Sequence, residues 1–230
     1  MNKQLKTRAS KVSEGSVDAP PGRRERAKRD KLRRITEAAR HLFETQGFEK
    51  TTTQQIADVA DIGTGTLFLY TESKEDLLIM VFEGEMREQA AHAFSRISES
   101  ASPVDQICSV FSDMMDYHAK DLMISEVLIK SMVMAPAAEH RSKIHGELMA
   151  TIFDGLEGIA MGAKKDGIFP KRLDAGVAAR TMFSCYYLGL VRWLTGQNTR
   201  EDFEARLRNQ CEQTIDPNGK ANKKRARALG

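Results

Sequence analysis

The chain has 230 residues, 41% of them hydrophobic, so it can bury a core without disulfides or metals. Its formal net charge of +3 hides a strong asymmetry. Residues 1–34 carry a net charge of +8, residues 216–230 carry +4, and the segment between them carries −9. An acidic body between two basic ends indicates a nucleic acid or another anionic partner that is met through the ends.

The composition excludes several classes of protein. Three cysteines, Cys108, Cys185 and Cys211, are too few and too far apart for a disulfide framework, and no Cys-x-x-Cys pair indicates a zinc ribbon. No apolar run approaches the ~20 residues of a membrane span, and the basic N-terminus lacks the apolar core of a signal peptide. We therefore expect a cytoplasmic protein without membrane contact.

No enzyme motif is present. The patterns Gly-x-Ser-x-Gly, His-Glu-x-x-His and the phosphate-binding Gly-x-x-x-x-Gly-Lys loop are all missing. The sequence therefore predicts a protein that is not an enzyme and that needs no cofactor or metal.

The first part of the chain predicts a basic arm followed by short and long helices. Residues 1–28 are polar and should be disordered. Apolar residues recur at three- and four-residue spacing from Ile35 to Phe43, which predicts a helix that ends before Gly47. Two short helices follow: one carries Ile56, Ala57 and Ala60 after possible N-caps at Thr51-Thr52-Thr53, and the other spans 64–70. A long helix then begins at Ser73, with Asp76 completing a capping box, and runs to about residue 98.

The rest of the chain also predicts helices. Ser102-Pro103 is a start signal for a helix that reaches about Ala119. Further helices are expected over about 121–134, from beyond Pro136 to near residue 165, over 174–195 and over 200–215. The segment 216–230 should be a disordered basic tail. No alternating β pattern competes, so the fold class is all-α with about nine helices.

Residues 31–77 carry the functional signal, because two short helices joined by a tight break form a helix-turn-helix pattern. Small residues are needed where these helices cross, and Ala57 and Ala60 supply them. Ile62 is the apolar anchor in the turn, and Leu67 is expected to face inward. The outward face, where base edges and phosphates would lie, carries small or polar groups: Thr64, Gly65, Thr66 and Tyr70.

This stretch resembles the TetR family of bacterial transcriptional regulators. The resemblance rests on Ala38-Ala39 through Phe43 with Gly47-Phe48, and on three further runs. These are Thr52-Thr53-Gln54-Gln55-Ile56-Ala57, Ala60-Asp61-Ile62-Gly63-Thr64-Gly65-Thr66-Leu67-Phe68-Leu69-Tyr70 and Ser73-Lys74-Glu75-Asp76-Leu77. Beyond about residue 78, only the number and length of the helices match the family.

The resemblance implies a homodimer that binds a palindromic operator and represses until a small ligand binds. It also implies the residues that contact DNA. In the family, the N-terminus of the domain's second helix contacts phosphates, the recognition helix contacts DNA from its start and through an aromatic pair, and a lysine begins the fourth helix. The corresponding residues here are Thr53, Gln54, Thr64, Gly65, Thr66, Phe68, Tyr70 and Lys74.

The sequence departs from the family at the recognition helix. Gly63-Thr64 stands where Ser-Lys is common, and Phe68 replaces a tyrosine that could donate a hydroxyl to phosphate. Binding would then depend more on a basic arm that includes Arg33 and Arg34, since arginine arms can enter the minor groove. The alternative for this basic run is simple solvation.

The larger C-terminal part is rich in methionine: eight of the 11 methionines lie between Met114 and Met182. Methionine side chains adapt to irregular apolar ligands, so we expect a cavity for a small apolar effector, although each of these residues could equally belong to an ordinary core. The candidate lining residues are Phe111, Met114, Met115, His118, Met123, Met149, Phe153, Met182 and Tyr186.

The last two helices carry a stripe of small and apolar residues that predicts a dimer interface. The candidates are Ala175, Ala178, Ala179, Gly189, Trp193, Phe203 and Leu207. Burial within one subunit would produce the same stripe.

Together these features predict four segments. They are a disordered basic arm (1–28), a helix-turn-helix DNA-binding domain (29–78), a ligand-binding and dimerisation domain (79–215) and a disordered basic tail (216–230). The function expected is a ligand-responsive transcriptional regulator, a repressor by resemblance, that binds DNA as a homodimer. The alternative is an all-helical small-molecule binding protein without specific DNA binding.

Overall fold

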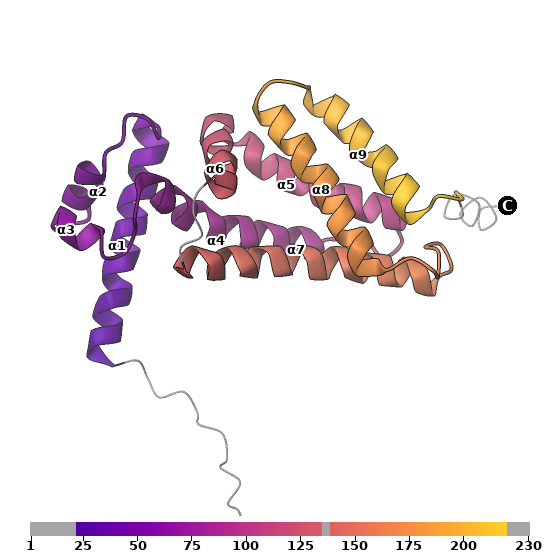
Figure 1. The fold of residues 1–230 in the computed structure, drawn as a ribbon, viewed down its shortest axis with the longest axis horizontal. Coiled ribbons are helices and arrows are strands. Elements are labelled where there is room, and N and C mark those ends of the chain that lie inside the picture. Colours follow the sequence, from indigo (N-terminus) through magenta and orange to yellow (C-terminus); the bar gives the residue numbers. More distant parts are fainter. Residues whose placement is uncertain (1–21, 135–138, 220–230) are drawn as a thin grey trace, which may run out of the picture.

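The computed structural model describes residues 22–134 and 139–219, and these residues form nine α-helices and no strand (Figure 1). The all-α prediction is confirmed. The predicted disorder over 1–21 and 220–230 lies outside the described residues. The helices are α1 (Arg23–Gln46), α2 (Thr53–Val59), α3 (Thr64–Leu67), α4 (Lys74–Ser95), α5 (Pro103–Ala119), α6 (Leu122–Met134), α7 (Glu139–Lys165), α8 (Ala175–Leu194) and α9 (Arg200–Ile215).

Local side-chain caps explain why so many helix starts follow the sequence signals. The side chains of Ser73, Ser102, Asp174 and Thr199 each accept a hydrogen bond from the backbone N–H three residues further on. Each cap satisfies an amide that the helix itself leaves unpaired. Within the part of the chain that the structure covers, no helix is both long and apolar enough to cross a bilayer.

Two predicted boundaries are wrong. Helix α1 begins at Arg23, so residues 23–28 are helical and not part of a disordered arm; Arg and Lys are good helix formers, and Glu25 and Arg29 pair one turn apart at 3.6 Å. Helix α3 ends at Leu67 and not at residue 70. The N–H groups of Leu69 and Tyr70 bond to carbonyls three residues back, which tightens the chain into turns.

Helix α4 joins the two parts of the molecule. Helices α1–α3 lie at one end, and α4 leads from them into the larger body, where it lies alongside α7 (Figure 1). The predicted domain boundary at residue 78 therefore falls inside a continuous helix. Five positions close to that boundary are buried: Leu77, Leu78, Ile79, Val81 and Phe82. Burial on all sides indicates that α4 packs within one hydrophobic core that continues from α1–α3 into the larger body.

The stripe of small residues on α8 and α9 faces the subunit's own core, and most of the predicted dimer residues are buried there. Ala175, Ala178, Ala179, Phe203 and Leu207 are at most 8% exposed, and the half-buried Trp193 packs against the same core. At Gly189 an added Cβ would lie 2.1 Å from the Phe203 ring, so the glycine permits α8 and α9 to approach closely within one chain. The prediction that this set of residues faces a partner subunit is therefore wrong.

We expect Gly189→Ala to lower the free energy of unfolding by about 1–3 kcal/mol, because the buried Phe203 ring has no room to move away. Gly158→Ala is the matched control: it also lies within a helix, but its added Cβ would meet nothing within 4 Å. It should be neutral or slightly stabilising, since alanine favours helices. Urea unfolding of both variants measures the difference, and equal effects would contradict the packing described for α8 and α9.

Candidate DNA-binding surface and ligand cavity

Helices α2 and α3 pack against each other and form one compact unit, called the brace below. Thr52 and Gln55 make a reciprocal capping box that begins α2. The chain then turns at Asp61, which has a φ of 52°, and the N–H of Ile62 bonds back to the Ala57 carbonyl at 3.0 Å. Ala57, Ala60 and Leu67 are buried where the two helices meet, as the sequence pattern predicts. Helix α3 is thus held rigidly on α2.

Several of the residues expected to contact DNA lie on the outward side of this brace, whereas Tyr70 is half-buried and packs against the hydrophobic core. The Thr64 hydroxyl donates to Gln54 Oε1 at 2.6 Å, and the Gln54 amide donates to Asp58 at 2.8 Å, so the starts of α2 and α3 are linked. Gly65 is exposed. Phe68 is 50% and Leu69 81% exposed directly after α3, although both side chains are large and apolar. Such groups can contact thymine methyls in a major groove.

Lys74 and the two arginines have protein partners of their own. Lys74 donates to the Phe48 carbonyl at 2.8 Å, and its ammonium group lies 4.2 Å from the Phe48 ring centroid, so it secures the turn between α1 and α2. Arg33 pairs with Asp30 at 2.7 Å and with Glu37 at 2.9 Å. Arg34 lies 3.6 Å from Asp61 in the turn before α3.

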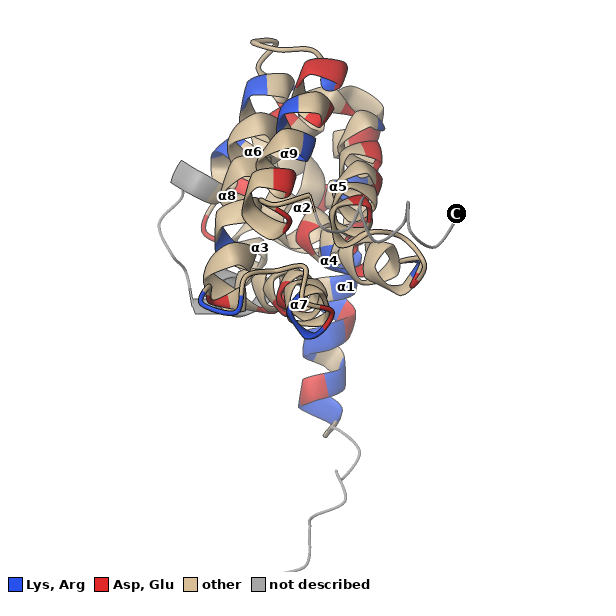
Figure 2. Cartoon of the chain, turned by 90° about the vertical axis from the view of Figure 1, so that its right-hand side faces the viewer, with Lys and Arg blue, Asp and Glu red and all other residues tan. Residues whose placement is uncertain are grey.

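Lys and Arg positions are frequent at the N-terminal end of α1, which projects from the body (Figure 2). The hydrogen bond from Arg33 holds the pKa of Asp30 below its usual value, so this carboxylate stays ionised beside the cations. Arg33 has a side chain that is 58% exposed, which leaves its guanidinium accessible to another anion.

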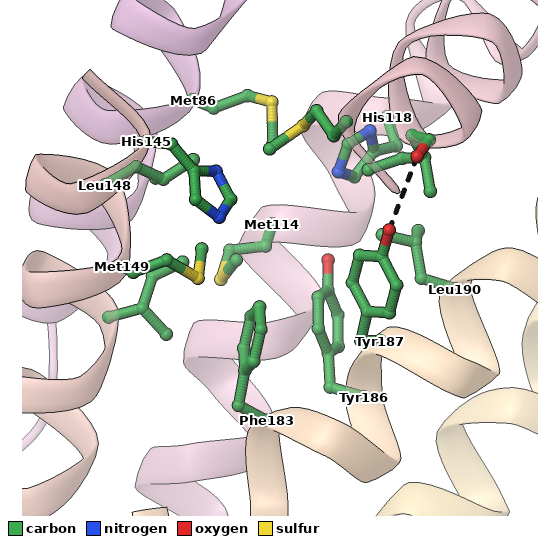
Figure 3. A pocket seen from close by; sticks show the side chains of 13 residues that line it. Met86, Met114, His118, His145, Leu148, Met149, Phe183, Tyr186, Tyr187 and Leu190 are labelled. Atoms are coloured by element: carbon green, nitrogen blue, oxygen red, sulfur yellow. Dashed lines mark hydrogen bonds between the residues drawn. The ribbon is translucent and has the colours of Figure 1, made fainter. Parts of the chain in front are cut away.

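The larger body contains an apolar cavity of about 210 Å³. Five helices contribute to it: α4, α5, α6, α7 and α8 (Figure 3). The lining residues are Met86, Met114, His118, Ile129, Met132, His145, Leu148, Met149, Ile152, Phe183, Tyr186, Tyr187 and Leu190. Four of these are methionines, which fits the adaptable cavity expected from the composition.

Four polar side chains interrupt the apolar lining. His118 is 1% exposed, and its Nδ1 lies 3.1 Å from the Ser125 hydroxyl. The His145 Nδ1 lies 3.0 Å from the buried Glu83 carboxylate. The Tyr186 hydroxyl is buried and has no hydrogen-bond partner among the described residues, whereas the neighbouring Tyr187 donates to the Ile129 carbonyl at 3.4 Å (Figure 3). Burial raises the pKa of Tyr186, so its hydroxyl keeps its proton.

The cavity differs in part from the set of residues that the sequence predicts. Met114, His118, Met149 and Tyr186 line it. The other five predicted residues are not among its lining. Met123 is 77% exposed on α6, Met115 and Met182 are buried elsewhere, Phe111 stacks behind the Tyr186 ring at 4.5 Å, and Phe153 packs edge-on against Phe183.

The sequence prediction did not include three other α8 residues of the lining: Phe183, Tyr187 and Leu190. Phe183 and Leu190 lie three residues before Tyr186 and four after it, on the same helix face, so helical spacing from Tyr186 would have found them; Tyr187, the next residue, carries no such signal. Met86 and His145 come from α4 and α7, and no sequence signal links those helices to Tyr186. No group of three or more His, Cys, Asp or Glu side chains within the described ranges could hold a metal ion.

A rigid helix-turn-helix unit tied by a shared helix to a cavity-bearing helical body is the architecture of a one-component DNA-binding regulator. Residues 35–81 match the family model described as "Bacterial regulatory proteins, tetR family". The chain is 28% identical over 171 residues to the fatty acid metabolism regulator protein of Bacillus subtilis, covering 73% of this chain and 85% of that protein. It is also 28% identical to the transcriptional regulator TtgR of Pseudomonas putida, covering 70% and 78%.

The solved structure of Thermus thermophilus FadR in complex with lauroyl-CoA has the same fold. It superposes with a TM-score of 0.61 at 21% identity, over 79% of this chain and 91% of that one. The chain belongs to the TetR family of bacterial transcriptional regulators.

Burial lowers the pKa of His118 to about 4, from 6.5 for a free imidazole. At a pH between these two pKa values, the His118 imidazole is protonated in the unfolded chain and neutral in the native state. The free energy of unfolding should therefore fall as the pH drops from about 6.5 to about 4, by up to about 3 kcal/mol from this group. His118→Asn cannot take up that proton, so urea unfolding at about pH 7 and about pH 4.5 should show a smaller loss than in the wild type. Equal losses in both proteins would contradict a neutral buried imidazole.

Proposed function

We propose that this protein is a homodimeric transcriptional repressor that binds a palindromic operator and releases it when a small, mainly apolar molecule enters the cavity. The observation that carries the proposal is the connection between its two parts. The exposed outward face of α2 and α3 is rigidly braced, and α4 runs without a break from that brace to the wall of the cavity. A regulator of this kind would act in the cytoplasm, where its operator is.

The DNA contacts divide into base-reading and phosphate-binding groups. Thr64, Gly65 and Thr66 would approach base edges in the major groove, and the exposed Phe68 would meet apolar groups there. Other residues would bind phosphates and fix the register: Thr53, Gln54, Tyr70, Lys74, Arg33 and Arg34. The hydrogen bond between Gln54 and Thr64 supports this arrangement because it orients both side chains before DNA arrives.

The dimer would form through the outward faces of α8 and α9, which lie side by side (Figure 1). Val177 is 57% and Leu188 62% exposed on α8, and a spacing of eleven residues sets them on one helix face. A twofold axis beside these helices would hold the two recognition helices at a defined half-site separation.

The coupling between cavity and DNA would run through the start of the body. His118 lines the cavity, and the preceding residue on α5, Tyr117, donates to Glu85 on α4 at 3.1 Å. Glu85 pairs in turn with Arg40 on α1, and Arg40 also donates to the Val81 carbonyl at 3.1 Å. A ligand that displaced α5 would therefore disturb a polar contact that reaches the DNA-binding domain.

The related proteins support an apolar effector. One relative is named as a regulator of fatty acid metabolism, and the superposed Thermus protein holds lauroyl-CoA. The methionine-rich lining of this chain's cavity is compatible with a hydrocarbon portion of a ligand.

The proposal is tested by selecting bound duplexes from a random DNA pool and titrating the selected duplex against the full chain. A specific regulator should enrich an inverted repeat, and log K should fall with log salt by ~0.9 per phosphate neutralised. A small-molecule binding protein without DNA function would enrich no sequence, and that result would reject the repressor.

We expect Gly65→Glu to weaken binding to the selected duplex by about tenfold or more, because it brings a carboxylate against the phosphates. An added Cβ at Gly65 meets nothing within 4 Å, so the domain itself should tolerate the change. Gly158→Glu, at an equally open position on α7, is the matched control and should bind like the wild type. If both variants bound the duplex equally well, α3 would not be the recognition helix.

A further inference from the structure

Tyr186 presents a polar atom that the protein leaves without a partner. Its side chain is 1% exposed and lines the cavity, and its hydroxyl points into it (Figure 3). No described residue bonds to that hydroxyl. Buried hydroxyl groups are ordinarily satisfied, so an orphan at a cavity wall indicates a missing ligand group.

Aromatic packing fixes the Tyr186 ring, so its hydroxyl cannot move to another hydrogen-bond partner. Phe111 stacks on it with ring centroids 4.5 Å apart and planes 8° from parallel. Phe203 and Phe183 lie at 5.7 Å and 6.1 Å from it. The hydroxyl is therefore preorganised at one point of the cavity wall.

A second group offers the complementary hydrogen-bonding role. The Ser125 hydroxyl donates to the His118 carbonyl at 3.2 Å, so the contact between Ser125 and Nδ1 is satisfied when Nδ1 carries the ring proton. That tautomer leaves Nε2 as an acceptor on a residue that lines the cavity. Because burial keeps this imidazole neutral, it can bond a hydroxyl without supplying a charge.

Among the residues that the structure describes, the cavity lining offers no cation to a carboxylate or phosphate. None of its described lining residues is Lys or Arg. Its other histidine, His145, is already paired with the Glu83 carboxylate at 3.0 Å, so a proton on that ring would be neutralised within the protein. Moving an anion into this lining would cost far more than moving a neutral molecule.

The cavity volume indicates the size of ligand that it can hold. An engineered cavity of ~150 Å³ holds one benzene ring, and the cavity here measures about 210 Å³. Space of this size suits a molecule of about two fused rings and is below the ~300 Å³ at which sites for drug-sized ligands begin.

We propose that the cavity binds a compact, uncharged, mainly apolar molecule through one hydroxyl or carbonyl oxygen, which hydrogen-bonds to the Tyr186 hydroxyl. His118 is the second polar contact for a hydroxyl group, and the methionines enclose the apolar part. This inference rests on the proposed effector function and names the chemical class of the effector.

The test uses three probes that share one ring system: naphthalene, 2-naphthol and the anion 2-naphthoate. Their affinities for the full chain are measured by fluorescence titration without DNA. The wild type should bind 2-naphthol about two- to twelve-fold more tightly than naphthalene, the gain of one neutral hydrogen bond. It should bind 2-naphthoate more weakly than 2-naphthol.

Two variants locate the polar contact. Tyr186→Phe removes only the hydroxyl and should abolish the preference for 2-naphthol over naphthalene. Its thermal midpoint should equal or exceed that of the wild type, because an unsatisfied buried group is lost. Tyr187→Phe is the matched variant in the same cavity. It should keep the preference, since the Tyr187 hydroxyl is already bonded to the Ile129 carbonyl.

Four results would overturn the proposal: equal affinity for naphthalene and 2-naphthol, a preference that survives in Tyr186→Phe, tightest binding of 2-naphthoate, or binding of none of the three. Failure of the repressor function is distinguishable from these. If 2-naphthol binds with the expected pattern but the chain enriches no DNA sequence, the ligand class holds and the repressor function fails. If operator DNA is bound specifically but no probe binds, the reverse is true.

Discussion

Helix α4 lies in a single hydrophobic core that continues from the helix-turn-helix unit into the larger body, and the rest of the structure depends on this continuity. Leu77 and Leu78 are fully buried near its start, and Met86 lines the cavity only two turns later. Each fully buried apolar side chain stabilises by about 1.5–3 kcal/mol, so the helix cannot turn or slide freely against either part. The orientation of α3 relative to the cavity is therefore set by packing and not by a flexible linker. The polar contacts among Arg40, Glu85 and Tyr117 also join α1, α4 and α5 at specific points.

At this cavity the body departs from close packing. Protein interiors are normally filled, and leaving a buried hydroxyl unsatisfied costs about 1–3 kcal/mol. The Tyr186 ring stacks closely on Phe111, whereas its hydroxyl end borders the open space of the cavity. A ligand that filled the space and bonded the hydroxyl would recover both losses. Binding would thus stabilise one arrangement of α5 and α8, which is the physical requirement for a ligand to shift a conformational equilibrium.

The helices were predictable from sequence wherever a local signal marked their ends. Ser102 followed by Pro103 begins α5 as expected, because capping involves residues only three positions apart. The dimer stripe was misassigned for the opposite reason. A small residue such as Gly189 signals that something approaches closely, but the sequence cannot say whether that neighbour is Phe203 of the same chain or a partner subunit. Composition likewise indicated a methionine-rich cavity without distinguishing Met114, which lines it, from the exposed Met123.

The sequence by itself determined the all-α class, the helix-turn-helix motif and the family, because caps, apolar periodicity and motif spacing are local properties of the chain. Only the tertiary structure decided which side chains meet. Met86, His145 and Tyr187 come together from three helices far apart in the sequence, and the Tyr186 hydroxyl is left unpartnered because the aromatic rings around it fix its position. Such contacts follow from how whole helices pack, and short stretches of sequence do not encode that packing.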